Sequence, residues 1–447
     1  MSRPTGMRAF MLIWFGQVIS LLGTGMTQFA LTLWAYQVTG SATALALVSF
    51  FTFGPTVLFT PIAGALVDRW NRKLVMMLSD LGSGAGTISI LLLYVTGNLQ
   101  IWHLYVAGIV SGIFYTFQWP AYSAGITTML HKSQYARADG LLGVADQASR
   151  VLAPILATTL LATIGIAGVL VIDIVTFVFA VGTLLMIYIP QPQRSASGVE
   201  GKGSLWAESI YGFRYIFRRP SLVGLLMTFF FVNLVTTFSI TLFAPMILAR
   251  TGSDQTILAT VQSIGAAGGV VGALLLSVWG GPKRRIHGVL LGMVAVSLAL
   301  LTVGVGQTVV LWSLGWFVCW LAAPILNGSS QAIWQSKVAP DVQGRVFAAR
   351  RMIAQIVAPV SMLLAGPLAD RIFEPAMQTG GTLVDTFGSL VGVGPGAGMA
   401  LIFVITSVMG VGVGLAGYAF PVVRNAEDLL PDHVPDEAAA VAAPAAS

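Results

Sequence analysis

Twelve apolar stretches, each long enough to cross a membrane as a helix, follow one another along the chain. A hydrocarbon core of about 30 Å is crossed by about 20 helical residues. The stretches lie at residues 7–38, 42–67, 74–96, 100–130, 138–163, 167–189, 221–250, 255–279, 286–306, 309–336, 343–373 and 397–421. Only 9% of the residues are charged, against about 25% in soluble domains. The pattern excludes a soluble fold and predicts an all-α membrane protein with twelve transmembrane helices.

The basic residues predict how these helices are oriented. Of the 23 Lys and Arg residues, 20 fall on alternate connections and helix ends. They are Arg3, Arg8, Arg69, Arg72, Lys73, Lys132, Arg137, Arg194, Lys202, Arg214, Arg218, Arg219, Lys283, Arg284, Arg285, Lys337, Arg345, Arg350, Arg351 and Arg424. Basic connections stay in the cytoplasm, so both termini are expected there, in a multi-pass protein of the inner (plasma) membrane. The same bias explains the net charge of +6 without a nucleic-acid partner.

A long connection in the middle of the chain divides the predicted helices six and six. We expect an N-terminal six-helix bundle at 1–189, a cytoplasmic linker with an interfacial helix at 190–220, a C-terminal six-helix bundle at 221–424 and a disordered cytoplasmic tail at 425–447. The first span is expected to remain in the mature protein, because no cleavage pattern follows it. Two six-helix halves suggest an internal repeat, which transporters commonly use to build a substrate path at its interface.

The connection after the second span carries the most specific motif. Its residues, Gly64-Ala-Leu-Val-Asp68-Arg69-Trp-Asn-Arg72-Lys73, resemble the G-x-x-x-D-R-x-x-R-[KR] signature of the major facilitator superfamily. Further segments resemble its exporter branch of transmembrane secretion effectors, macrolide efflux proteins and enterobactin exporters: Arg150-Val-Leu-Ala-Pro154, Asp173 with Thr176-Phe177, and 206–216. The stretch after residue 373 looks most like exporters encoded beside nonribosomal peptide synthetases. The resemblance implies two pseudo-symmetric bundles, alternating access, and proton-driven export of a small molecule.

The motif also suggests a conformational latch at the cytoplasmic side. In the fold that the chain resembles, the second helix faces the start of the eleventh, so Asp68 would meet a helix N-terminus, where a carboxylate is stabilised. The predicted latch comprises Gly64, Asp68, Arg69, Arg72, Gly344 and Arg345; the alternative is a solvated basic loop. The segment from Gly366 to Asp370 repeats the same spacing at the outer side, as a second latch or as an ordinary helix end.

Charged residues inside the spans are candidates for coupling transport to protons. Asp146 and Arg150 are four residues apart and share a helix face, and Asp173 lies at a depth that the Arg150 side chain could reach. The three residues form either a permanent neutralised network or a proton carrier whose carboxylate loses its partner when the cavity opens. The family's drug/proton antiporters carry an Arg in the fourth span, but the segment 105–112 has none. Asp80 is expected to support the neighbouring basic loop.

The first, fourth, seventh and tenth spans line the cavity in the fold that the chain resembles. Their candidate substrate contacts are Gln17, Gln28, Gln118, Trp119, Tyr122, Asn233, Asn327, Gln331 and Trp334, which could equally serve helix packing. None of these spans carries a charge in its middle, so a neutral or weakly charged amphipathic solute is expected.

Enzyme and ATP-binding patterns are missing from the sequence. No Walker loop occurs, and the four histidines lack metal-ligand spacing, so no cofactor and no metal are expected. The prediction is a secondary transporter, not an enzyme, that exports a drug or a peptide-type natural product in exchange for protons. An uptake symporter of the same fold and a non-transporting sensor or assembly factor are the alternatives.

Overall fold

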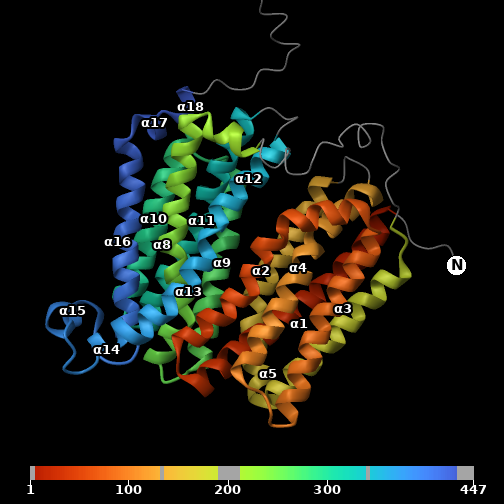
Figure 1. Ribbon diagram of the computed structural model, residues 1–447, viewed down its shortest axis with the longest axis horizontal. Helices are drawn as coiled ribbons and strands as arrows, with labels where there is room; N and C mark the ends of the chain where they lie inside the picture. The colour runs from red at the N-terminus through yellow and green to blue at the C-terminus, as the bar shows by residue number, and fades with distance from the viewer. Residues whose placement is uncertain (1–5, 131–134, 190–211, 339–342, 430–447) are drawn as a thin grey trace, which may run out of the picture.

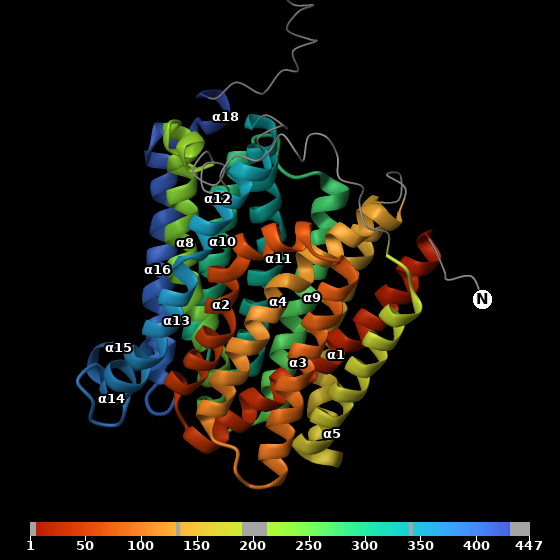
Figure 2. The same cartoon turned by 45° about the vertical axis from the view of Figure 1, so that its right-hand side comes forward.

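The protein is an assembly of long helices arranged in two halves. The computed structural model describes residues 6–130, 135–189, 212–338 and 343–429. In Figures 1 and 2, the first five labelled helices form one half, in red to yellow, and the helices from α8 to α16 form the other, in green to blue.

The N-terminal half follows the predicted spans closely. Its helices are α1 (Gly6–Thr39), α2 (Ala42–Arg69), α3 (Arg72–Val95), α4 (Ile101–Met129) and α5 (Tyr135–Met186). The long α5 covers two predicted spans, because the chain reverses within it at Gly165 with φ 67° and ψ −175°. A positive φ costs a glycine little, so the fifth and sixth spans are joined almost without a loop.

The C-terminal half contains the other six predicted spans. They are α8 (Pro220–Arg250), α9 (Gln255–Trp279), α10 (Arg285–Val305), α11 (Val309–Lys337), the run α12 (Gln343–Gln355), α13 (Val357–Leu368) and the π-helical turn η2 (Ala369–Phe373), and α16 (Ala397–Ala419). Two short helices, α14 (Glu374–Met377) and α15 (Val384–Val391), lie between η2 and α16.

Each of the twelve predicted ranges falls on a helical stretch. Within the described part of the chain, ten helices are long and apolar enough to cross a membrane, and one of them contains the Gly165 break. The all-α membrane fold is therefore confirmed, while the count of twelve crossings stays a prediction.

The bundle has two distinct ends. The last helices, α17 (Pro421–Arg424) and α18 (Ala426–Leu429), lie at one end, and α14 and α15 lie at the opposite end. The basic residues predict that the first end faces the cytoplasm and the second faces outward. We call them the cytoplasmic end and the outer end.

The start of the C-terminal tail differs from the prediction. Residues 426–429 form α18, although disorder was expected from 425 onward. The Glu427 carboxylate accepts hydrogen bonds from the backbone N–H groups of Arg285 and Ile286 at 3.1 and 2.9 Å, and Asp428 pairs with Arg284 at 2.6 Å. A carboxylate at a helix N-terminus satisfies donors that have no partner within the helix, so α18 caps α10. The rest of the tail, and most of the predicted interfacial helix in the linker, lie outside the described residues.

The two halves touch mainly along two pairs of helices. In each case one helix comes from each half: α2 packs on α13, and α5 packs on α9. The Ser263 hydroxyl on α9 donates to the Val151 carbonyl on α5 at 2.8 Å. Both pairs cross the boundary that the predicted repeat defines.

Glycines allow backbones to approach closely within the C-terminal half. A Cβ at Gly268 of α9 would lie 2.3 Å from the Phe317 carbonyl oxygen of α11, and one at Gly272 would lie 2.2 Å from that of Leu321. Small residues permit such contacts, which membrane helices use for association. The α9–α11 pair therefore depends on these two positions having no side chain.

We expect Gly268→Val to destabilise the C-terminal half, because the added side chain forces α9 and α11 apart. Overpacking costs about 3 kcal/mol, equivalent to a melting temperature about 6–12 °C lower for a bundle of this size. The measurement is thermal unfolding of the purified protein. The matched control is Gly412→Val on α16, where nothing lies within 4 Å of the added Cβ; equal melting temperatures for both variants would contradict the packing argument.

Candidate functional site

A buried carboxylate, Asp80 on α3, lies at the centre of a polar cluster in the N-terminal half. Its side chain is only 7% exposed. Gln118 of α4 donates to Oδ1 at 2.8 Å, and Gln17 of α1 donates to Oδ2 at 3.2 Å. The expectation that Asp80 supports the basic loop is therefore wrong: its partners are two amides that the sequence assigned to the cavity.

The amides around Asp80 are suited to both protonation states of the carboxylate. The Gln118 Nε2 also donates to Gln17 Oε1 at 3.2 Å, whereas Gln118 Oε1 is buried and has no hydrogen-bond partner in the described part of the chain. An amide carries both donors and an acceptor. A rotated Gln118 amide would thus accept a hydrogen bond from a protonated Asp80 as readily as the present one donates to the carboxylate.

A second buried carboxylate, Asp173 on α5, has hydroxyl partners. Thr24 of α1 donates to Oδ1 at 3.3 Å and Thr87 of α3 donates to Oδ2 at 3.1 Å. Its side chain is buried. In the described part of the chain, the hydrogen bonds of Asp173 come from threonines rather than from Arg150, the partner that the sequence suggested, and Arg150 is exposed. The side chain of Asp146 lies outside the described residues.

In the C-terminal half, the charged side chain of Arg350 lies next to polar residues of a neighbouring helix. The Arg350 guanidinium on α12 donates to Gln331 Oε1 at 2.9 Å and to the Ser330 hydroxyl at 2.8 Å, both on α11. It also lies 5.0 Å from the ring centre of Trp334. Arg350 was expected among the cytoplasmic basic residues, and the sequence did not show that it contacts Gln331, one of the predicted cavity residues. A neighbouring helix thus adds a charge that the middle of α11 lacks.

The other predicted cavity residues do not form one cluster. Gln28 and Asn327 are exposed, Asn233 is half-buried, and the side chain of Trp119 lies outside the described residues. Asn327 donates to the Ala323 carbonyl of its own helix at 2.9 Å. Tyr122 is buried, and its hydroxyl has no partner among the described groups. The structure thus brings together Gln17 with Gln118, and Gln331 with Trp334, and leaves the central cavity a prediction.

The predicted cytoplasmic latch falls mostly outside the described side chains. This holds for Gly64, Asp68, Arg69, Gly344 and Arg345. Arg72 is buried at the start of α3. The role of this latch stays a prediction.

The outer latch suggested by the repeated motif is a close contact between the halves. Asp370 of η2 accepts hydrogen bonds from the N–H groups of Ala42 and Thr43 at 3.0 and 2.8 Å, and from the Ser41 hydroxyl at 2.6 Å. It therefore caps the first turn of α2 across the boundary. A Cβ at Gly366 would lie 2.4 Å from the Thr43 Cα. The outer ends of α2 and α13 are thus packed backbone against backbone.

A second group of charged side chains at the outer end, Glu374 and Arg250, was not predicted to have a structural role. The Glu374 carboxylate accepts from the N–H groups of Gly396 and Met399 at 3.0 and 2.8 Å, at the start of α16. Arg250, at the end of α8, donates to the Gly306 carbonyl at 2.9 Å and to the carbonyls of Gly396 and Val391. The only sequence signal was that Arg250 departs from the distribution of basic residues. Its partners are carbonyl groups, which no residue pattern reveals.

Two helical halves that contact each other through paired helices, with buried carboxylates inside apolar spans, define a multi-pass membrane transporter. The chain belongs to the Major Facilitator Superfamily, whose family model matches residues 13–361. Among curated proteins, it is 25% identical over 381 residues to macrolide efflux protein A of Streptococcus pyogenes, covering 81% of this chain and 90% of that protein. It is 26% identical over 380 residues to the multidrug efflux pump Tap of Mycolicibacterium fortuitum, covering 80% and 89%.

Other similarities agree with this assignment. The enterobactin exporter EntS of Shigella flexneri is 25% identical over 221 residues, covering 49% of this chain and 54% of that protein. A mutant of the nucleoside transporter NupG matches the fold with a TM-score of 0.71 at 14% identity, covering 91% and 99%. A bacterial homologue of the human lysosomal transporter Spinster, in an inward-facing and unoccupied conformation, matches with a TM-score of 0.68 at 15% identity, covering 95% and 98%. The predicted family and the exporter relatives are confirmed.

Proposed function

We propose that the protein exports an amphipathic small molecule, such as a drug or a peptide-type natural product, in exchange for protons. The observation that carries the coupling is the Asp80 cluster: a carboxylate in a predicted membrane span whose hydrogen-bond partners in the described part of the chain are neutral amides. Ionisable residues at such positions are expensive and usually functional. We infer the direction of transport, export, from the similarity to efflux proteins.

The outer contact supports alternating access. The carboxylate of Asp370 and the backbone around Gly366 hold the outer ends of α2 and α13 together, as expected for a state closed to the outside. For export, this contact opens to release the substrate, while the predicted latch with Asp68 and Arg345 closes the cytoplasmic end. The same five-residue spacing, Gly followed by Asp four residues later, serves both ends.

Polar groups inside each half fit a substrate with a few hydrogen-bonding groups. Tyr122 offers a buried hydroxyl without a partner in the described chain, and Arg350 presents a guanidinium beside Trp334. Pockets for drug-sized molecules are mostly apolar with a few placed polar groups. Because the Arg350 guanidinium donates hydrogen bonds, solutes that carry hydrogen-bond acceptors, such as macrolactones and peptides, suit the proposed substrate path better than a purely apolar solute.

The experiment is dye transport in everted vesicles with an imposed pH difference of about one unit, comparing vesicles that contain the protein with vesicles that lack it. A proton exporter accumulates the dye when the lumen is acidic, and the accumulation collapses with a protonophore. Accumulation that follows an imposed Na⁺ gradient instead would assign a different coupling ion. Flux only in the opposite direction would identify an uptake symporter. If pure proteoliposomes transport neither the dye nor any other amphipathic solute that is tested, the sensor or assembly role remains.

A further inference from the structure

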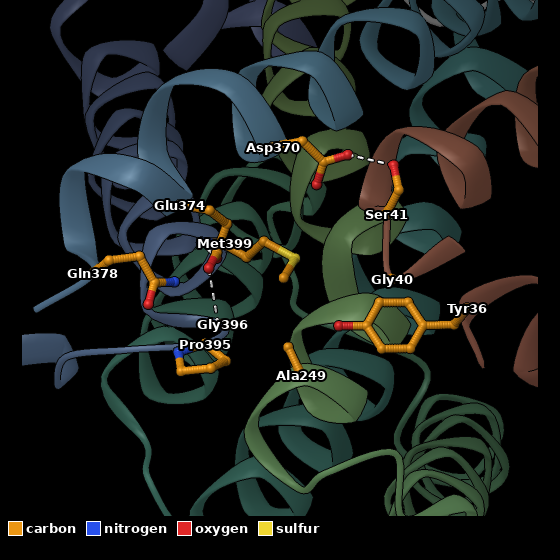
Figure 3. Close-up of a pocket in the computed structure, with 10 residues that line it drawn as sticks. All are labelled: Tyr36, Gly40, Ser41, Ala249, Asp370, Glu374, Gln378, Pro395, Gly396 and Met399. Carbon is orange, nitrogen blue, oxygen red and sulfur yellow. Dashed lines mark hydrogen bonds between the residues drawn. The ribbon is translucent and has the colours of Figure 1, made fainter. Parts of the chain in front are cut away.

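A cavity of about 440 Å³ lies at the outer end, between the two halves. Figure 3 shows its walls, which include Tyr36 and Ser41 from the N-terminal half and Ala249, Asp370, Glu374 and Met399 from the C-terminal half. The Tyr36 ring, Ala249 and Met399 give it apolar sides, and the two carboxylates give it an acidic one. No residue of the proposed coupling cluster is part of it.

The two carboxylates leave the cavity with an excess of negative charge. Each oxygen of Asp370 and Glu374 accepts one or two hydrogen bonds from the protein. A carboxylate has about four acceptor positions, so both retain capacity for a further donor. Arg250 is the nearby cation, and its guanidinium is occupied by three backbone carbonyls. Two negative charges therefore face one positive charge.

The Tyr36 hydroxyl is the independent sign that a ligand belongs here. Tyr36 is only 9% exposed, and its hydroxyl makes no hydrogen bond within the described chain. Figure 3 shows the phenol oxygen turned into the cavity rather than toward a protein partner. The hydroxyl therefore opens onto the cavity without a protein partner among the described residues, and it is available to a molecule bound there.

We propose that the outer cavity binds an organic ammonium group. The ammonium N–H groups would donate to Glu374 and Asp370, and the Tyr36 hydroxyl would accept a further one. The hydrocarbon part of the ligand would lie against Ala249 and Met399.

Other ligand classes fit this cavity poorly. A divalent metal ion needs several oxygen ligands at 2.0–2.6 Å around one point, and the described residues contain no group of three His, Cys, Asp or Glu side chains placed to hold one. An anion would meet two carboxylates. Because the walls come from both halves, a bound ammonium group also stabilises the closed outer end. A role of the outer cavity as an exit site for a substrate amine rests on the proposed export, whereas the binding of an ammonium group in the cavity does not depend on it.

The test is the binding of benzylammonium to the purified full-length protein in lipid nanodiscs, measured by calorimetry at constant ionic strength. Benzyl alcohol, which has the same shape without the charge, serves as the comparison ligand. We expect benzylammonium to bind at least tenfold more tightly than benzyl alcohol. Glu374→Gln should weaken benzylammonium at least tenfold, and Tyr36→Phe, which removes one hydroxyl and leaves the packing intact, should weaken it about threefold to tenfold.

The control variant is Asp385→Asn, since Asp385 is an exposed carboxylate on α15 at the same end of the molecule and should leave binding unchanged. Equal binding of both ligands, or benzylammonium binding that neither Glu374→Gln nor Tyr36→Phe weakens, would overturn the proposal. A protein that binds benzylammonium as expected but transports nothing would retain this site and lose the proposed function. The two failures are therefore distinguishable.

Discussion

Asp80→Asn is expected to abolish transport driven by a pH difference while the protein still folds and still exchanges substrate for substrate. Asparagine has the shape of the carboxylate but does not titrate, so it mimics one protonation state. The Gln17 and Gln118 amides can rotate to satisfy the new amide, and the fold should therefore persist. In proteoliposomes, we expect uphill flux to fall at least tenfold, with substrate counterflow within about twofold of the wild type.

The control for Asp80→Asn is Asp385→Asn, which changes an exposed carboxylate at the outer end. Asp173→Asn is the decisive comparison, because Asp173 is also buried and its hydrogen-bond partners among the described residues are threonines rather than a cation. If Asp80→Asn keeps uphill flux and Asp173→Asn loses it, coupling belongs to Asp173. If both variants keep uphill flux, the proton path does not use either carboxylate and the predicted pair Asp146 and Arg150 becomes the remaining candidate.

Gly366→Val is expected to hold the outer end open and to stop transport. A Cβ at this position would lie 2.4 Å from the Thr43 Cα, and a backbone atom cannot move aside as a flexible side chain would. The opening is measured in a Cys319→Ala background by labelling Ala42→Cys with a membrane-impermeant maleimide. Ala42 is 1% exposed when the contact is closed. We expect labelling at least ten times faster than without Gly366→Val, and less than a tenth of the wild-type flux.

Two further variants make this result specific. Gly412→Val adds the same side chain in a place where nothing lies within 4 Å, and it should leave labelling and flux unchanged. Asp370→Asn weakens the cap on α2 without a clash, so we expect an intermediate labelling rate. If Gly366→Val leaves the labelling of Ala42→Cys as slow as it is without this substitution, the α2–α13 contact does not close the outer end.

The positions of the helices could be predicted from the sequence because the apolar runs are long and their breaks are short. The observed bounds differ from the predicted ones by three residues or fewer at almost every end, and the Gly165 reversal lies inside the predicted connection between 163 and 167. The Gly-x-x-x-Asp spacing also indicated the outer contact. These features depend on residues that are close in sequence.

The contacts between helices could not be predicted in the same way. A membrane helix that is apolar on all sides has no polar face that fixes its rotation, so the sequence does not show which way Asp80 or Arg350 points. Asp80 was expected to support the neighbouring basic loop and Arg350 was counted with the cytoplasmic charges, whereas both side chains contact amides on neighbouring helices. Asp173 and Arg150 were paired from depth alone, but the rotation of α5 directs Asp173 toward Thr24 and Thr87.

The closure of the outer end relies on groups that water can also satisfy. When the halves separate, the Asp370 carboxylate, the Ser41 hydroxyl and the first N–H groups of α2 can each exchange a protein partner for a water molecule, so the net gain from each bond is about 0.5–1.5 kcal/mol, or about 1.5–3 for bonds to a charged group. The three bonds to Asp370 together therefore favour the closed end by several kcal/mol. A solute that prefers the open state tenfold offsets about 1.4 kcal/mol of this difference. A tenfold preference of the substrate for the open state is thus too small to open the outer end on its own.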